Sequence, residues 1–267
     1  MSPAQLYIIG TSHRHTVSRS NGSNTAKVQA EVYKIGEWLI EKEGIQLLLP
    51  EGLFKRKPEP DEREVFVHSA FEEKGKGPLP FQFIRERLSD PSAYLNAEML
   101  LKEHFGIPTR QIEDRELYDA VGECLTRLED ARDDTAEALL LRDELCYLQE
   151  KRTAFMLQKV PEILEEEVGR GALTARKAIF TIGLSHIADI IRYLKEEKIR
   201  VYAPLYSRVG SDDYIEAVRL IREQYGITVI IPKTLADDPN VLLSNGIDPN
   251  SLPRPGAPLP GGTAAFP

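Results

Sequence analysis

The chain has 267 residues, of which 42% are hydrophobic and 28% charged, proportions typical of a globular protein. Its 34 basic and 42 acidic residues give a formal net charge of −8, which provides no general attraction to nucleic acid or to an anionic membrane. No stretch approaches the roughly 20 apolar residues of a membrane span, and no basic and apolar leader opens the chain. We therefore expect a cytoplasmic protein without a nucleic-acid or membrane partner.

The first element read along the chain is part of a pattern that occurs twice. Residues 6–13 read Leu-Tyr-Ile-Ile-Gly-Thr-Ser-His, and residues 178–186 read Ala-Ile-Phe-Thr-Ile-Gly-Leu-Ser-His. Each copy predicts a buried parallel strand that stops at a glycine and turns. Because ligands bind outside the carboxyl ends of strands in open α/β sheets, we expect His13 and His186 at one working edge. A polar turn without further function is the alternative for either copy alone.

The segment after His13 leads into a predicted βαβ unit. Residues 14–24 show no apolar periodicity and form either a lid over the strand edge, with Arg14 above the site, or an exposed disordered loop. Thr25 begins a helix that Gly44 closes, and residues 45–51 predict the second strand. A crossover of this kind should bring Glu51 to the same edge as His13.

The remainder alternates irregular, helical and extended patterns. A long connection at 55–80 contains one short strand at 65–68, and a second extended piece covers 107–115. Helices are predicted at 81–89, 92–105, 115–131, 134–168 (with Pro161 as a candidate kink), 187–197 and 212–225, and strands at 178–182, 199–203 and 227–231.

These patterns predict one α/β domain over residues 1–247, followed by a disordered tail at 248–267 that is rich in proline and glycine. The domain should contain a mainly parallel sheet of two related βα halves flanked by helices, with a helical insertion at about 81–168. Cys124 and Cys146 fall in helical patterns without metal-ligand spacing, so we expect reduced packing residues.

The predicted edge brings together two imidazoles and one carboxylate, from His13, His186 and Glu51. Such a set can bind a divalent metal such as zinc or manganese, with a position left open for water. It can equally work without any cofactor, as a general base with an orienting acid. Ser185 is predicted to cap the next helix, which would place His186 at the positive end of the helix dipole and favour its neutral ring.

Common catalytic motifs are absent from the sequence. It contains no nucleophile elbow, phosphate-binding loop, dinucleotide-binding glycine pattern or His-Glu-x-x-His motif. One alternative is the His-x-His pair of His13 and His15, the form used by metal-dependent hydrolases built on (β/α) barrels. Such sites need further ligands at later strand ends, whereas His68 and His104 fall in an irregular connection and a helix.

The paired motifs resemble the TraB family and its relatives in the Tiki, erythromycin-esterase-like and ChaN-like superfamily, which carry paired Gly-x-x-His motifs. Residues 96–112, followed by Glu-Asp114-Arg115, are similar to a helix and strand that end in an acidic-Arg element in TraB proteins. Glu150-Lys-Arg152 is similar to the family's Glu-Arg-Asn/Asp helix. The resemblance covers roughly residues 5–232. Thr153 departs from the pattern, which has Asp or Asn there, and Glu51 is followed by glycine, with Arg56 as a candidate for a later arginine.

The resemblance implies two related halves with a polar site between them, and a hydrolase-like or metal-binding role. Arg152 and Arg115 become candidates to stabilise an oxyanion or hold an anionic substrate group, although surface ion pairs are an alternative for both. Ser12, Arg14, Ser185 and Asp114 become candidates for substrate binding. We therefore expect a hydrolase of a small-molecule or peptide-like substrate, with a non-catalytic small-molecule or metal-binding or sensing protein on the same scaffold as the alternative.

Overall fold

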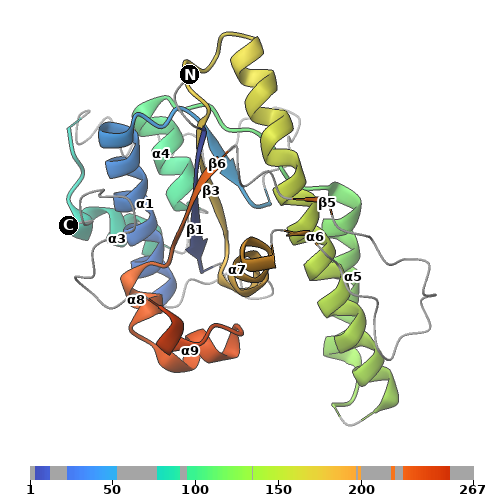
Figure 1. The fold of residues 1–267 in the computed structure, drawn as a ribbon. Coiled ribbons are helices and arrows are strands. Elements are labelled where there is room, and N and C mark those ends of the chain that lie inside the picture. Colours follow the sequence, from blue (N-terminus) through green and yellow to red (C-terminus); the bar gives the residue numbers. More distant parts are fainter. Residues whose placement is uncertain are drawn as a thin grey trace, which may run out of the picture.

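The computed structural model describes residues 4–12, 23–52, 77–90, 95–133, 135–196, 198–199, 218–219 and 225–252. Over these ranges the chain has the expected α/β architecture (Figure 1). The principal elements are, in order, β1 (Ala4–Thr11), α1 (Ser23–Glu43), β2 (Leu48–Pro50), α3 (Phe81–Ser89), α4 (Ala97–Phe105), α5 (Arg115–Asp130), α6 (Ala136–Gly169), β3 (Lys177–Gly183), η1 (Leu184–His186), α7 (Ile187–Glu196), β4 (Lys198–Ile199), β5 (Val218–Arg219), β6 (Tyr225–Ile230), α8 (Lys233–Ala236), α9 (Pro239–Ser244) and η4 (Pro249–Ser251).

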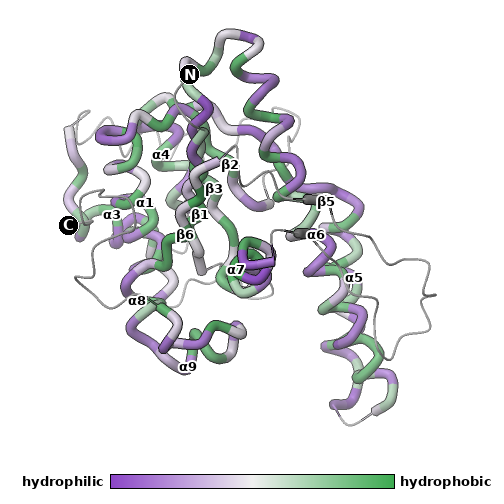
Figure 2. Tube along the Cα trace, in the orientation of Figure 1, coloured by the Kyte–Doolittle hydropathy of each residue, from purple (hydrophilic) through white to green (hydrophobic). Residues whose placement is uncertain are grey.

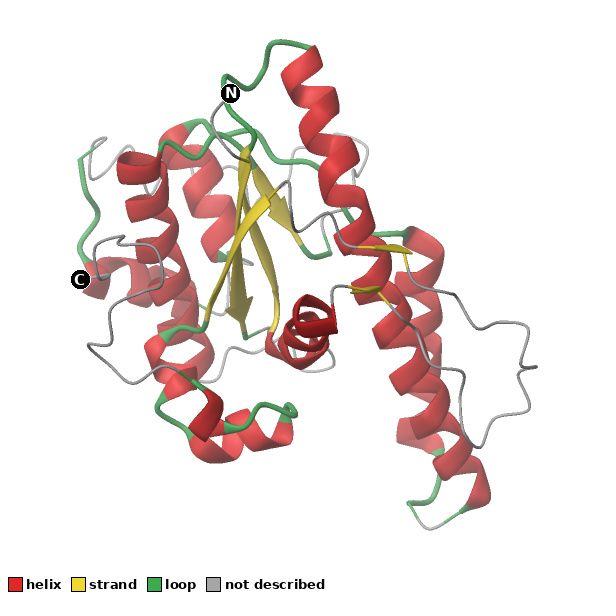
Figure 3. Ribbon diagram, viewed as in Figure 1, coloured by secondary structure: helices red, strands yellow, loops and turns green. Residues whose placement is uncertain are grey.

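Four strands form an all-parallel sheet in the order β2-β3-β1-β6 (Figure 3). The two strands that carry the repeated pattern, β1 and β3, are direct neighbours, with Thr11 opposite Gly183. Both are almost wholly buried, as expected for parallel strands covered on two faces. The glycines of the two repeated motifs, Gly10 and Gly183, therefore lie at the same edge of the sheet on adjacent strands, offset by one residue.

Helices cover both faces of this sheet. Figure 1 shows α1, α3 and α4 on one face and α6 and α7 on the other. The largest buried side chains come from both layers and from the sheet, among them Tyr33, Phe180 and Tyr193. Apolar positions follow the strands in Figure 2, while charged and apolar positions alternate along α5 and α6. The helix α5 lies along the N-terminal half of α6, and this pair projects away from the sheet.

The 34-residue helix α6 continues through Pro161, which had been a candidate kink. It begins at a threonine cap, because the Thr135 hydroxyl accepts a hydrogen bond from the backbone nitrogen of Ala138 at 3.1 Å. Among the described residues, no helix combines the length and the apolar character needed to cross a membrane.

The second half of the chain contains a short sheet of its own. Of the predicted strand at 199–203, residue 199 lies in β4, and residues 200–203 lie outside the described residues. The strand β4 pairs antiparallel with β5 in this separate two-stranded sheet. Since β5 lies within the stretch predicted as a helix at 212–225, that prediction is wrong at 218–219. Apolar residues at helical spacing do not exclude a short paired strand, because pairing depends on a partner distant in sequence.

Several short elements and boundaries also differ. Helices α8 and α9 lie in a stretch for which no element was predicted, and η4 occupies the start of the predicted disordered tail. The side chain of Asp248 stabilises this turn by accepting from the backbone nitrogen of Asn250 at 2.9 Å. The rest of the tail (253–267), the predicted strand at 65–68 and residues 14–22 lie outside the described residues.

Two glycines in helices differ in how closely other side chains pack against them. Gly36 on α1 faces the buried side chain of Leu101 on α4, and an added Cβ would overlap a Leu101 methyl group. Gly36→Ala is therefore expected to lower the free energy of unfolding by about 1–3 kcal/mol. Gly122→Ala on α5, where a Cβ meets nothing within 4 Å, is expected to raise it by about 0.5–1 kcal/mol. Urea denaturation of both variants checks this, and shifts in the same direction would contradict it.

Candidate active site

Glu51 lies directly after β2 and is tied to β3 through both its backbone and its side chain. Its backbone nitrogen donates to the carbonyl oxygen of Thr181 at 2.9 Å, which continues the strand pairing by one residue. Its Oε2 accepts from the backbone nitrogen of Gly183 at 2.6 Å. Gly183 is the glycine of the second repeated motif. The expected position of Glu51 at the carboxyl edge of the sheet is confirmed.

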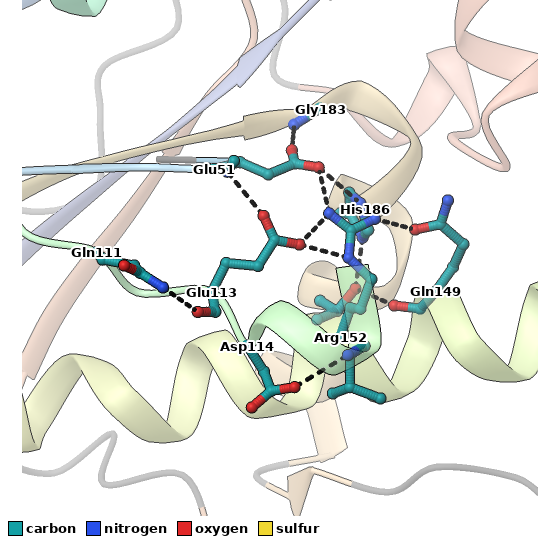
Figure 4. A network of polar contacts seen from close by, with 11 residues as sticks. Glu51, Gln111, Glu113, Asp114, Gln149, Arg152, Gly183 and His186 are labelled. Atoms are coloured by element: carbon teal, nitrogen blue, oxygen red, sulfur yellow. Dashed lines mark hydrogen bonds and ion pairs between the residues drawn. The ribbon is translucent and has the colours of Figure 1, made fainter. Parts of the chain in front are cut away.

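Arg152 reaches this edge from α6 and has a side chain only 5% exposed (Figure 4). Its Nη2 donates to Glu51 Oε1 at 2.9 Å, its Nε donates to Glu113 Oε1, and its Nη1 donates to Gln149 Oε1 at 2.9 Å. The guanidinium carbon also lies 5.4 Å from the ring centroid of Tyr118, within cation–π range. One cation thus holds two buried carboxylates.

Glu113 comes from the extended piece between α4 and α5. This piece continues the sheet beyond β2, because the backbone of Leu48 bonds to that of Pro108 and Arg110, each at 3.0 Å. The side chain of Glu113 then turns inward, where Oε2 accepts from the backbone nitrogen of Gly52 at 2.7 Å. Burial raises the pKa of Glu113 and the charge of Glu51 adds to this, while Arg152 opposes it.

His186 closes the η1 turn that joins β3 to α7. Its side chain is 3% exposed, and its Nε2 lies 3.4 Å from Glu51 Oε1. Its Nδ1 lies 2.6 Å from Thr153 Oγ1 on α6, the next residue after Arg152. Of the predicted convergence of His13, Glu51 and His186, the structure shows the approach of Glu51 and His186, and His13 lies outside the described residues. Four side chains, those of Glu51, Glu113, Arg152 and His186, thus form one cluster that we call the edge cluster.

With Arg152 charged, the net charge of the edge cluster is zero only when one further proton is bound to His186, Glu51 or Glu113. Two ionised carboxylates and one guanidinium give a net charge of −1 when the His186 ring is neutral. A proton on that ring or on either carboxyl brings the sum to zero. Since uncompensated charge is costly in a buried environment, the cluster is suited to take up and release a single proton.

The first repeated motif can be followed only to Ser12. The predicted site residues His13 and Arg14 lie outside the described residues. The Ser12 carbonyl oxygen accepts from Gln29 Nε2 at 2.9 Å, and its hydroxyl lies 3.4 Å from that of Thr25, so both groups of Ser12 contact α1.

Ser185 does not cap the helix that follows. The capping position of the η1 turn is occupied by Gly183 without a side-chain hydrogen bond, and Ser185 itself is exposed. The prediction of a serine cap is therefore wrong, because Ser185 lies inside the 3-10 turn that precedes α7.

Asp114 and Arg115 take structural positions at the start of α5. The Asp114 side chain caps the helix by accepting from the backbone nitrogen of Leu117 at 2.9 Å. Arg115 is 64% exposed and pairs with Asp119 at 2.8 Å, one turn further along. Sequence reasoning chose these two residues and missed Glu113. The sequence did contain a signal for Glu113. An aspartate just before a helix, such as Asp114, is typical of a helix cap, so Glu113 was the acidic residue of this segment that remained available for a site.

A metal is a poor fit to the described part of the site. Among the residues that the structure describes, no three His, Cys, Asp or Glu side chains are grouped to hold a metal ion. The predicted third ligand, His13, lies outside these residues. Arg152 bonds to the same Glu51 oxygen that faces His186, and a guanidinium at this position repels a cation. We therefore derive no chemistry through a metal.

A surface pocket of about 470 Å³ reaches the edge cluster from the side of Glu113. Its walls are the 110–115 segment and the α6 side chains of Phe155 and Lys159. The basic groups at this pocket are already paired, for example Arg110 with Glu166 at 2.7 Å and Lys159 with Glu162 at 2.7 Å. The pocket therefore provides space beside the cluster without an excess of unpaired positive charge.

No protein-family model, curated protein or solved structure matches this chain, so its function has to be argued from the site itself.

The raised pKa of Glu113 leads to a prediction on stability. Between pH 4.5 and the folded-state pKa, the folded protein binds more protons than the unfolded chain, so the Glu113 contribution is lost as pH rises through this window. The difference in unfolding free energy between wild type and Glu113→Gln should therefore decrease with rising pH. Urea denaturation from below pH 4.5 to neutral pH measures it.

Glu166→Gln provides the control of opposite sign. Hydrogen bonding to Arg110 lowers the pKa of Glu166, so its contribution is present at higher pH and is lost as pH falls through the folded-state pKa. A Glu113 difference curve that rises with pH, as the Glu166 curve should, would contradict the assignment.

Proposed function

We propose that this protein is a hydrolase in which His186 and Glu51 activate a water molecule at the carboxyl edge of the parallel sheet. The observation that carries the proposal is the approach of His186 Nε2 to Glu51 Oε1 at 3.4 Å, with both side chains fixed on their other sides. Glu51 is fixed by the backbone of Gly183, and His186 by the hydroxyl of Thr153. An imidazole beside an oriented carboxylate is the arrangement that general base catalysis requires.

In the proposed reaction, His186 Nε2 accepts a proton from water as the water oxygen attacks the carbonyl carbon or phosphorus of the substrate. Glu51 stabilises the resulting imidazolium, which then gives the proton to the leaving group. The charge of the cluster changes from −1 to zero and back during this cycle. Arg152 holds Glu51 in place through its hydrogen bond to Oε1. Its Nη1 donates to the neutral Gln149, so exchange of this partner for a substrate oxyanion breaks no ion pair.

The resemblance to the TraB, Tiki and erythromycin-esterase-like proteins belongs to this proposal. Three residues that the resemblance marks, Glu51, Arg152 and His186, come from distant parts of the sequence and lie in contact. A small-molecule or peptide-like substrate is the class that the resemblance implies. The pocket beside Glu113 is the space that we assign to it.

A non-catalytic binding or sensing protein is the second candidate, and the burial of the edge cluster favours it. The side chains of its four members are between 1% and 10% exposed. A cluster so enclosed can register the binding of a ligand by exchanging a proton without turning the ligand over.

A screen of ester, amide and phosphoester substrates distinguishes the two candidates. Wild type is compared with Glu51→Gln and His186→Gln, and with Glu123→Gln, which changes an exposed carboxylate on α5. The hydrolase proposal predicts turnover that both site variants lose, that the control keeps, and that a chelator leaves unchanged. Tight binding of a small molecule without turnover by wild type would establish the second candidate instead.

A further inference from the structure

Thr153 is fully buried on α6 and lies between the backbone of its own helix and the ring of His186. Its hydroxyl oxygen lies 2.9 Å from the carbonyl oxygen of Gln149, one turn earlier, and 2.6 Å from His186 Nδ1. Both neighbours lie within hydrogen-bond distance, so this one hydroxyl serves two partners of different character. The carbonyl can only accept a hydrogen bond, whereas the ring nitrogen can donate or accept.

Because the Thr153 hydroxyl has a single hydrogen, it can donate to the Gln149 carbonyl or to His186 Nδ1, but not to both. If Thr153 donates to the Gln149 carbonyl, its oxygen is left to accept, and Nδ1 must carry a hydrogen. If it donates to Nδ1, the ring hydrogen of a neutral His186 must be on Nε2, directed at Glu51. Donation to the carbonyl four residues earlier is a common arrangement for a threonine inside a helix, and with a protonated Nδ1 it gives Thr153, the Gln149 carbonyl and Nδ1 a hydrogen-bond partner each.

We propose that Thr153 is a positioning residue that holds neutral His186 as the Nδ1–H tautomer and thereby makes Nε2 the nitrogen that exchanges a proton. This inference rests on the proposed function, because it names the atom that carries the proton in hydrolysis. In this tautomer the lone pair of Nε2 is available to a water molecule next to Glu51. In the other tautomer Nε2 would already hold a hydrogen, and His186 could not act as the base.

The same geometry satisfies the protonated ring. The imidazolium donates from Nδ1 to Thr153 and from Nε2 towards Glu51, while Thr153 continues to donate to Gln149. No hydrogen bond of Thr153 changes when Nε2 takes up or releases its proton. The hydroxyl therefore supports both states of a proton-transfer cycle.

The neutral character of Thr153 matters for the charge of the edge cluster. The resemblance described above implies Asp or Asn at this position. An aspartate here would add a third carboxylate to Glu51 and Glu113 around the single guanidinium of Arg152. Threonine orients the ring without adding charge, so the cluster still needs only one extra proton for neutrality.

Nitrogen NMR of protein labelled with ¹⁵N-histidine tests the proposal directly, because the two ring nitrogens have different shifts in each tautomer. His186→Gln identifies the signals of His186 by their loss. For the neutral ring in wild type, we expect a protonated Nδ1 and an unprotonated Nε2. Thr153→Ser should keep this pattern. Thr153→Val, which has the same shape but no hydroxyl, should convert the neutral ring to the Nε2–H tautomer.

A neutral wild-type ring with the hydrogen on Nε2 would overturn the proposal, as would identical tautomers in wild type and Thr153→Val. The wild-type and Thr153→Ser spectra are decisive even if the valine variant does not fold. The spectra need no substrate, so they separate this inference from the proposed function. The expected tautomer in a protein that hydrolyses nothing would support the positioning role and reject the hydrolase.

Discussion

Replacement of Arg152 by methionine is expected to lower the free energy of unfolding by about 3–5 kcal/mol, the usual range when one partner of a buried ion pair is removed. Methionine fills similar space but leaves Glu51 and Glu113 close together without their common cation. Both carboxylates are then buried with uncompensated charge. Urea denaturation at neutral pH measures the loss.

Arg142→Met is the matched control, because Arg142 lies on the same helix and pairs with Asp133 at the surface. The side chains of this pair are 47% and 89% exposed, so its loss should cost less than about 1 kcal/mol. Adding Glu113→Gln to Arg152→Met should restore part of the stability, since it removes one of the two unpaired charges. Equal losses of unfolding free energy in Arg152→Met and Arg142→Met would show that the buried ion pairs of the edge cluster stabilise the fold no more than a surface pair does.

Replacement of His186 by glutamine is expected to reduce hydrolysis about 10²- to 10⁴-fold, the range typical of a lost general acid–base group. Glutamine keeps a polar side chain near Thr153 and Glu51 but cannot exchange a proton near neutral pH. The ratio kcat/KM, measured on a substrate found in the screen, checks this loss.

His104→Gln is the comparison for that experiment. His104 lies on α4, on the opposite face of the sheet from α6, and its Nδ1 contacts the hydroxyl of Tyr33. This substitution should alter stability without removing hydrolysis. A loss of kcat/KM in His104→Gln as large as that in His186→Gln would assign the effect to folding and not to catalysis.

The sheet and two residues of the site, Glu51 and His186, could be predicted from the sequence because both depend on local patterns. Continuous apolar runs that end in glycine marked β1 and β3, and their repetition predicted that they share an edge. Glu51 and His186 were found because each follows directly from the end of a strand. Proximity to a strand end is information that a single stretch of sequence contains.

The other half of the site depends on contacts between distant segments, which no local pattern encodes. Glu113 was missed because the family pattern directed attention to Asp114 and Arg115, and the sequence alone does not show that the segment lies next to β2. Tyr118 and Gln149 lie on helices whose orientation towards the edge is set by tertiary packing. The family pattern identified Arg152, and it marked Thr153 only as a departure. The strand β5 was missed for the same reason, since its pairing partner is distant in sequence.

The contacts that build the edge cluster also bear on when it forms during folding. Glu51 meets Arg152 across 101 residues of chain and Gly183 across 132. Closing loops of this length before any other contact exists costs conformational entropy, and a few polar contacts alone compensate little of that cost. The pairing of β2 with β3 spans a similar separation but forms backbone hydrogen bonds and buries apolar side chains, so we expect it and the docking of α6 to come first. Residues of the cluster should form their interactions after the rate-limiting step, so that their substitution accelerates unfolding much more than it slows folding.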